Sequence, residues 1–177
     1  MAIYKKITSS WYVIHTKSRF ENVVYDGLVK KRVEVFSPLI TVKSKRLDRK
    51  LFYKAPLFPG YIFVNTSSNP ADQLNILKTT GVVRFIGNSR GAIAVPERNI
   101  ESLKIMVSAD KKIETGTGFN AKDKIIVING ILKGVEGYFA SYSGEDRVVV
   151  NIETLGQFAA VNINRDDVEL IPKSLIK

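Results

Sequence analysis

The sequence predicts an α+β fold in two parts, an antiparallel sheet with flanking helices followed by a small five-stranded, SH3-like β-barrel. Residues 1–107 alternate β-rich runs with amphipathic helical patterns, whereas residues 122–177 contain only short β-rich runs separated by turn residues. Residues 108–121 between them lack periodicity and are rich in polar residues and glycine. We therefore expect two domains, 1–107 and 122–177, joined by a linker at 108–121.

The first strand and the first helix are predicted to follow one another directly. Trp11–Thr16 is a β-rich run. Ser18 and Glu21 then have the spacing of a capping box, which predicts a helix start at this point. The apolar residues that follow recur at helical spacing and form one stripe: Phe20, Val23, Val24 and Leu28.

The next segment predicts two strands around a basic loop. Val33–Val42 is the second strand, with Pro38 at an edge or a bulge. Lys43–Lys54 is densely basic, which predicts an exposed hairpin loop, and Pro56–Val64 returns as the third strand. From Tyr61 onward this strand is apolar on both faces, so something has to cover the second face of the sheet.

Two more helices and a fourth strand complete the first part. Asn69 and Pro70 predict an N-cap and a first helical residue, in a helix that carries Leu74 and Leu77. Val82–Ile86 is the fourth strand. A third helix opens at Val95–Glu97, and its apolar side is formed by Ile100, Leu103 and Val107.

The last part predicts five short strands with turns at Asn129–Gly130, Ser143–Gly144 and Leu155–Gly156. The strands are expected at Lys124–Ile128, Val135–Tyr142, Arg147–Ile152, Phe158–Ile163 and Val168–Leu170.

Charge and composition restrict the function. The net charge is +10, and residues 1–107 hold 18 Lys and Arg against 7 Asp and Glu, a balance of +11, whereas the remainder has 9 against 10, or −1. Such asymmetry suits a first part that meets a polyanion, although a solvated basic surface without a partner has the same charge. There is no cysteine and only one histidine, which excludes disulfides, thiolate metal sites and a His-rich metal site.

We expect a cytoplasmic, monomeric protein that binds partners and catalyses no reaction. No run approaches the roughly 18 apolar residues of a membrane span. We find no carboxylate pair, Ser–His–Asp set or Walker loop, so an enzyme is disfavoured and no cofactor is expected.

Several motifs resemble those of one family, the NusG-type transcription elongation factors. Trp11–Val13, Pro56–Val64 and Gly81–Phe85 are similar to its N-terminal (NGN) domain. Lys124–Val127, with Gly130 and the Gly134–Gly137 segment, is similar to the KOW motif of its C-terminal domain. The resemblance spans essentially the whole chain.

The resemblance implies that the first domain binds the clamp helices of RNA polymerase and promotes processive elongation. The apolar patch that would do so includes Phe58, Tyr61 and Phe63, which we expect to lie exposed, with Ile62 and Val64 facing the core. On the first strand Trp11 and His15 share the parity of the patch. Ordinary core aromatics and a bystander histidine are the alternatives for these residues.

The resemblance also implies contacts with nucleic acid and with a second partner. Lys17 and Arg19 match a region that faces the non-template DNA strand, and Lys78 and Arg84 are weaker candidates. The KOW domain of the family recruits ribosomal protein S10 or Rho through loops that align with Leu132, Val135 and Leu155. These positions are aliphatic here and often aromatic in general NusG proteins, which puts both partners in doubt.

Two alternatives remain open at this stage. The segment Ser37–Arg46 before the third strand is closer to RfaH-type and capsule-operon antiterminators, so we favour a specialised paralogue over the general factor. A ribosome-associated, KOW-type RNA-binding protein is the other candidate.

Overall fold

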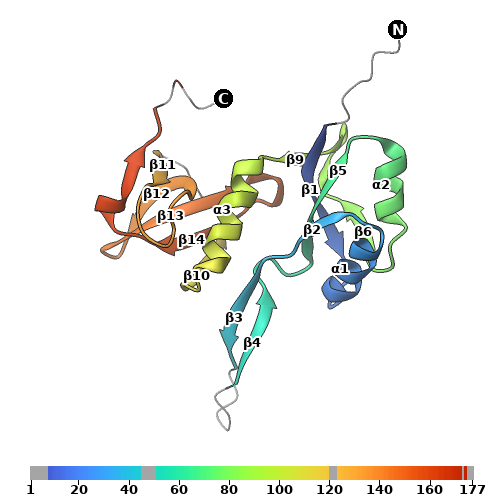
Figure 1. Cartoon of the computed structure of the whole chain (residues 1–177), viewed down its shortest axis with the longest axis horizontal. Coiled ribbons are helices and arrows are strands. Elements are labelled where there is room, and N and C mark those ends of the chain that lie inside the picture. Colours follow the sequence, from blue (N-terminus) through green and yellow to red (C-terminus); the bar gives the residue numbers. More distant parts are fainter. Residues whose placement is uncertain (1–7, 45–50, 120–122, 173, 175–177) are drawn as a thin grey trace. The chain divides into compact units, whose positions relative to one another are not determined.

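The computed structural model describes residues 8–44, 51–119, 123–172 and 174, and the chain divides into two compact units (Figure 1). The first unit comprises Met1–Ser37 and Phe58–Pro96, and the second comprises Pro38–Leu57 and Glu97–Lys177. The predicted boundaries of the two domains remain predictions, and the units are described here one at a time.

The first unit is built on a five-stranded antiparallel sheet. Its strands run in the order β2-β5-β1-β6, with β9 pairing β1 beside this path. They span β1 Ser9–Thr16, β2 Glu34–Phe36, β5 Tyr61–Ser67, β6 Val82–Phe85 and β9 Ala94–Val95. A two-residue ladder joins β7 Gly87–Asn88 to β8 Gly91–Ala92.

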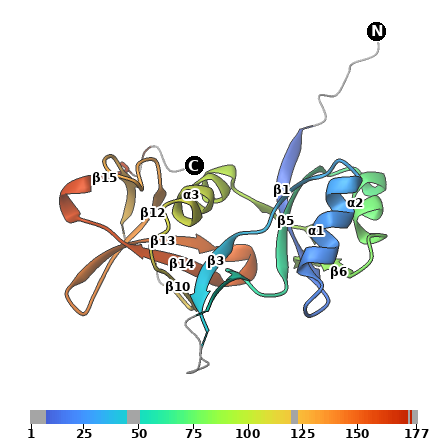
Figure 2. The same ribbon diagram turned by 60° about the horizontal axis from the view of Figure 1, so that its bottom comes forward.

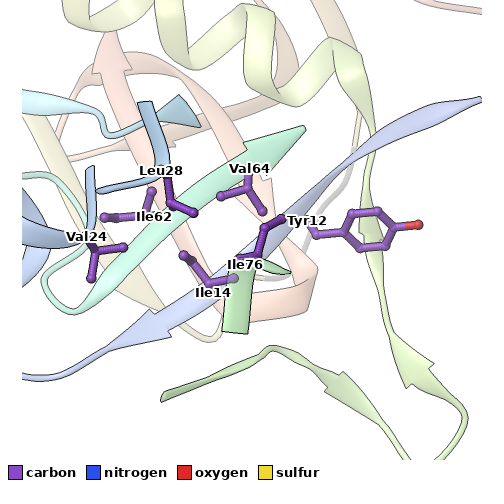
Figure 3. Packing of buried hydrophobic residues seen from close by; sticks show 7 residues of the cluster. All are labelled: Tyr12, Ile14, Val24, Leu28, Ile62, Val64 and Ile76. Atoms are coloured by element: carbon purple, nitrogen blue, oxygen red, sulfur yellow. The ribbon is translucent and has the colours of Figure 1, made fainter. Parts of the chain in front are cut away.

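Two helices, α1 Glu21–Lys30 and α2 Pro70–Leu77, cover one face of this sheet (Figure 2). Their buried side chains meet those of β1 and β5 in a cluster of completely or almost completely buried residues (Figure 3): Tyr12, Ile14, Val24, Leu28, Ile62, Val64 and Ile76. The expectation that Ile62 and Val64 face the core is therefore confirmed.

The start of α1 differs from the prediction. Ser18 lies in a turn, Phe20 is the N-cap residue, and no side chain caps the helix. The Glu21 carboxylate instead accepts a hydrogen bond from the backbone N–H of Gly60, at 2.9 Å. A long-range contact has taken the carboxylate that the capping box would have used. Of the predicted stripe, Val24 and Leu28 are buried, whereas Phe20 and Val23 are exposed.

Prolines end strands where the sequence pattern alone suggested continuity. The predicted strand Val33–Val42 is divided at Ser37 and Pro38 into β2, which pairs β5, and β3, which pairs β4. The predicted strand Pro56–Val64 begins only at Tyr61. The helix after Asn69 forms as predicted, with the Asn69 side chain accepting from the N–H of Ala71 at 3.0 Å, although Ile76 is its buried residue.

The second unit contains a hairpin, a helix and a six-stranded sheet. The hairpin pairs β3 Leu39–Lys43 with β4 Phe52–Pro56, and the predicted loop lies partly outside the described residues. The sheet runs in the order β10-β14-β13-β12-β11-β15. Its strands are β10 Ile113–Thr117, β11 Lys124–Val127, β12 Glu136–Tyr142, β13 Glu145–Ile152, β14 Gln157–Asn162 and β15 Val168–Leu170.

The five predicted C-terminal strands are present, but the sheet has a sixth. Ile113–Thr117 lies in the segment predicted as linker, and it pairs with β14 along its whole length. Within the described residues the sheet has two edge strands, β10 and β15. The expected five-stranded barrel is therefore not confirmed. Short 3₁₀ turns at Glu153–Leu155 and Arg165–Asp167 link the last strands.

Helix α3 Glu97–Ser108 packs against β12 and β13 of this sheet. Its buried apolar residues Ile100, Leu103 and Met106 follow helical spacing. Ser102 is also buried, and its hydroxyl lies between the backbone groups of Glu136: it accepts from the N–H at 2.9 Å and donates to the carbonyl at 3.1 Å. The Asn99 side chain adds a bond to the Asn151 carbonyl at 3.0 Å.

Candidate functional site

The candidate site of the first unit begins at the bend before β5. Gly60 has a φ of +82°, a conformation that glycine adopts without strain. Its N–H donates to the Glu21 carboxylate, and its carbonyl accepts from the N–H of Thr16 at 2.9 Å. The Pro59–Gly60 bend is thus fastened to α1 and to the end of β1, which positions Tyr61 beside His15.

The strand register then places the predicted patch residues on one face. Tyr61 is paired with His15 and Phe63 with Val13, so their side chains project on the side of the sheet opposite the cluster of Figure 3. Trp11 shares this parity. The predicted alternation between patch and core positions on β1 and β5 is confirmed by the register.

The rings on this side contact one another. The centroids of His15 and Tyr61 are 5.3 Å apart, those of Phe36 and Phe63 are 5.9 Å apart, and those of Phe58 and Phe63 are 6.1 Å apart with the planes at 75°. These distances are typical of packed aromatic pairs. We call the set the aromatic face: Trp11, His15, Phe36, Phe58, Tyr61 and Phe63.

Exposure divides the aromatic face into two groups. Phe58, Phe63 and Trp11 are buried, with exposed fractions of 1 %, 0 % and 4 %. The expectation that the predicted patch lies exposed is therefore wrong for Phe58 and Phe63, and the packing of Phe63 between Phe58 and Phe36 accounts for part of their burial. Tyr61, His15 and Phe36 are half-buried, and Tyr61 and His15 form an accessible pair.

The four predicted nucleic-acid contacts are all exposed. Lys17 follows the last residue of β1, where its N–H donates to the Gly81 carbonyl at 2.8 Å, and Arg84 is paired with His15 across β1 and β6. Lys17 and Arg84 thus lie at the same end of β1. Arg19 occupies the turn that follows, with a φ of +64°.

Lys78 belongs to a second basic group that sequence reasoning did not assemble. It lines an open groove of about 420 Å³ together with Lys30 and Lys31 at the C-terminal ends of α1 and α2. The Lys31 ammonium donates to the Asn75 carbonyl at 2.6 Å and to the Thr79 hydroxyl at 2.8 Å. Only the tertiary packing of the two helices brings these lysines together.

The predicted partner contacts of the C-terminal sheet are mostly internal. Leu132 and Val135 are buried, with exposed fractions of 3 % and 0 %, and Leu155 is half-buried. Leu132 and Val135 therefore have almost no exposed surface with which to contact a partner directly, as the resemblance implies they would. The turn closed by the bond from the Lys133 N–H to the Gly130 carbonyl directs Leu132 inward and leaves Ile131 62 % exposed.

Charged side chains of the C-terminal sheet are paired both within and between strands. Arg147 on β13 contacts Glu114 on β10 and lies 3.1 Å from Glu145. The pKa of Glu114 is lowered, first by the hydrogen bond from Lys112 and then by Arg147. The pKa of Glu145 is lowered by hydrogen bonds from Arg147 and then Asn162. These groups form a ladder whose charges are mutually satisfied.

Within the described ranges no three His, Cys, Asp or Glu side chains are grouped so as to hold a metal ion. No helix of the described chain has the length and apolar character needed to cross a bilayer.

Comparison with known proteins identifies the family. The family model for the transcription termination factor NusG matches residues 9–104, more than half of the chain. Proteins called transcription termination/antitermination protein NusG are similar along most of their length. The protein of Borreliella burgdorferi is 23 % identical over 93 % of this chain and 100 % of its own. That of Bacillus subtilis is 28 % identical over 76 % and 78 % of the two chains.

A solved structure agrees on the fold. The structure titled "Domain interaction in Thermotoga maritima NusG" is similar with a TM-score of 0.54 at 22 % identity, covering 93 % of this chain and 98 % of that one. The family match favours a transcription factor over a ribosome-associated protein. The chain belongs to the NusG family of transcription termination and antitermination factors.

Proposed function

We propose that this protein is an elongation and antitermination factor that binds the clamp helices of RNA polymerase through its aromatic face. The observation that carries the proposal is the accessible His15–Tyr61 pair, which the register of β1 and β5 places side by side with the ring centroids 5.3 Å apart. Rigid aromatic side chains on a preformed face are the usual anchors for an apolar helix.

The proposed mechanism is binding without chemistry. A factor that contacts the clamp only in its closed state shifts the polymerase away from the opened, paused state by its differential affinity. The backbone N–H of Tyr61 donates to the Phe58 carbonyl at 3.1 Å, and Tyr61 and His15 make the contact with the clamp. Membership of the NusG family supports this role, since the similar proteins are named for termination and antitermination.

Two further contacts belong to the proposal. Lys17, Arg19 and Arg84 hold the non-template DNA strand beside the aromatic face, with Lys78 as a separate basic contact. The C-terminal sheet takes the KOW role and recruits a second partner, ribosomal protein S10 or Rho. Exposed Ile131 and half-buried Leu155 are the side chains able to reach it, and Leu132 and Val135 support them from the core.

We further propose that the protein is a specialised paralogue that works on a limited set of operons in the cytoplasm. The similarity of the Ser37–Arg46 segment to RfaH-type factors supports this assignment. The C-terminal sheet requires a glycine at position 137, since a Cβ there would lie 2.5 Å from the Val149 carbonyl oxygen. The gene neighbourhood tests the assignment: a position at the head of a long polysaccharide operon supports it, and a position among translation and secretion genes contradicts it.

The direct test of polymerase binding is a titration of core RNA polymerase with labelled full-length protein. We expect Tyr61→Ala and His15→Ala each to weaken binding at least about fivefold, the effect of losing more than 1 kcal/mol at an anchor. Tyr25→Ala is the matched control, because Tyr25 is 39 % exposed on α1, the helix that covers the opposite face of the sheet. Folded Tyr61→Ala protein that binds as tightly as wild type would show that the face is misassigned.

A further inference from the structure

The β3–β4 hairpin of the second unit carries an exposed aromatic ring on each face. Phe52 is 65 % exposed and Tyr53 is 54 % exposed. In the hairpin register Phe52 is opposite Lys43, and Tyr53 is opposite Val42. Because adjacent residues of a strand project to opposite faces, the two rings point away from each other. The hairpin therefore has one face on which an aromatic ring is surrounded by lysines.

The Phe52 face borders a pocket of about 310 Å³ between the hairpin, the C-terminal end of α3 and the start of β10. Its polar lining includes Lys54 on the hairpin and Asp110, Lys111 and Lys112 after α3. Aliphatic side chains, including Leu39, Val107 and Ile113, complete the lining. The volume is at the lower end of the range of small-ligand clefts, about 300–1,000 Å³, which suits one nucleoside rather than a duplex.

The lysines of this pocket keep hydrogen-bond donors available. The Lys54 ammonium donates to the Thr41 hydroxyl at 2.9 Å, and the Lys111 ammonium is 3.5 Å from the Asn162 carbonyl. Lys112 pairs with Glu114 at 3.0 Å, in an exposed pair that is worth little in water. Each ammonium has three donors, so these contacts leave several for an anion.

We propose that this pocket binds a nucleotide of single-stranded RNA. The base stacks on Phe52, and the flanking phosphates are held by Lys54, Lys111 and Lys112. Aromatic platforms with adjacent cations are the usual means of binding single strands, because every base has a face to stack and every phosphate a charge. In a duplex both faces of the base are already stacked, so a duplex does not fit this arrangement.

Asp110 provides the preference for RNA over DNA. A carboxylate in a basic pocket repels phosphate, but it accepts a hydrogen bond from a ribose 2′-hydroxyl, the group that distinguishes the two nucleic acids. Asp110 has a φ of +50°, so Asp110→Gly removes the carboxylate without straining the backbone. This site lies in the second unit and is independent of the proposed aromatic face in the first.

The test measures binding of the full-length protein to a fluorescent single-stranded RNA of mixed sequence, to DNA of the same sequence and to the DNA duplex. We expect RNA to bind most tightly, and Phe52→Ala to weaken RNA binding about 5- to 150-fold, the range for loss of one stacked base. Tyr53→Ala is the matched control on the opposite face, and it leaves RNA binding within about twofold of wild type. Circular dichroism checks that both variants are folded.

Three results would overturn the proposal. The first is equal RNA affinity for Phe52→Ala and wild type, and the second is a loss of affinity in Tyr53→Ala as large as that in Phe52→Ala. The third is DNA binding as tight as RNA binding in the wild type. We expect the preference for RNA to disappear in Asp110→Gly and with RNA methylated at the 2′-oxygens. A titration of core RNA polymerase with Phe52→Ala distinguishes this site from the proposed clamp contact. We expect Phe52→Ala to bind polymerase as tightly as wild type, because only the RNA site is lost.

Discussion

The residues of the aromatic face differ in exposure, and this difference separates structural rings from accessible ones. Phe63 is completely buried and packs between Phe36 and Phe58, whereas Tyr61, two residues earlier on the same strand, is half-buried beside His15. A substitution at Phe63 is therefore expected to lower the stability of the fold, and any loss of binding would follow from that. Tyr61 and His15 are the positions at which a loss of binding reports on the face itself.

Urea denaturation of variants in the first unit tests this distinction between structural and accessible rings. We expect Phe63→Ala to lower the free energy of unfolding by about 3–5 kcal/mol, because a large buried ring leaves a cavity. Tyr61→Ala should cost about 1 kcal/mol, the centre of the range for point mutants. If the two substitutions cost the same, the structural and accessible rings have been wrongly separated.

Ser102 is the residue that fixes α3 to the C-terminal sheet. Its buried hydroxyl satisfies both the N–H and the carbonyl of Glu136, so Ser102→Ala leaves a backbone donor without its partner. We expect a loss of about 1–3 kcal/mol in the free energy of unfolding, the cost of an unsatisfied buried group. Hydrogen exchange at the Glu136 amide should accelerate, while that at Ile62 in the first unit stays unchanged.

At the scale of elements, local signals were predicted well and long-range ones were not. The Asn69–Pro70 start of α2 depends on neighbouring residues alone and forms as predicted. The capping box at Ser18 fails because Glu21 is bonded to Gly60, which lies far along the chain. The sequence does not predict strand β10, because Ile113–Thr117 has weak alternation and contains Gly116, and only its pairing with β14 makes it a strand.

The same distinction applies to the candidate site. Strand parity placed Tyr61, Phe63 and His15 on one side of the sheet, because parity follows directly from sequence position. The expected exposure of Phe58 is wrong, since burial depends on turns and on neighbouring rings that no periodicity encodes. Lys30 and Lys31 were not grouped with Lys78 because only the packing of α1 against α2 brings them together.

The charge ladder of the C-terminal sheet makes its stability depend on pH. The pKa of Glu114 is lower in the folded state than its ordinary value of 4.5, so its contribution is fully present above 4.5 and is lost as the pH falls through the lowered folded-state value. We expect the Tm difference between wild type and Glu114→Gln to be largest near neutral pH and to shrink on acidification. Glu169→Gln, at an exposed position of β15, is the control and should produce no such pH-dependent difference. A difference that stays constant down to acid pH would contradict the assignment.

At the scale of the whole molecule, the positive charge is concentrated in one part of the chain. Residues 1–107 carry a balance of +11, whereas the remainder carries −1. In the second part the ladder of Glu114, Arg147 and Glu145 pairs opposite charges, which leaves little net field. Long-range attraction of a polyanion therefore arises from the first part, and the proposed DNA contacts are located there.

The salt dependence of DNA binding tests this distribution directly. Each phosphate contact on a single strand contributes about 0.7 to the slope of log K against log salt concentration, because bound counterions are released. We expect the double variant Lys17→Ala/Arg84→Ala to bind single-stranded DNA more weakly and with a slope smaller by about 1.4, the value for two contacts. The double variant Lys133→Ala/Arg165→Ala removes the same charge from exposed positions of the second unit, and its slope should match that of wild type. Equal slopes for both double variants would mean that the DNA responds to net charge alone and that Lys17 and Arg84 hold no phosphate.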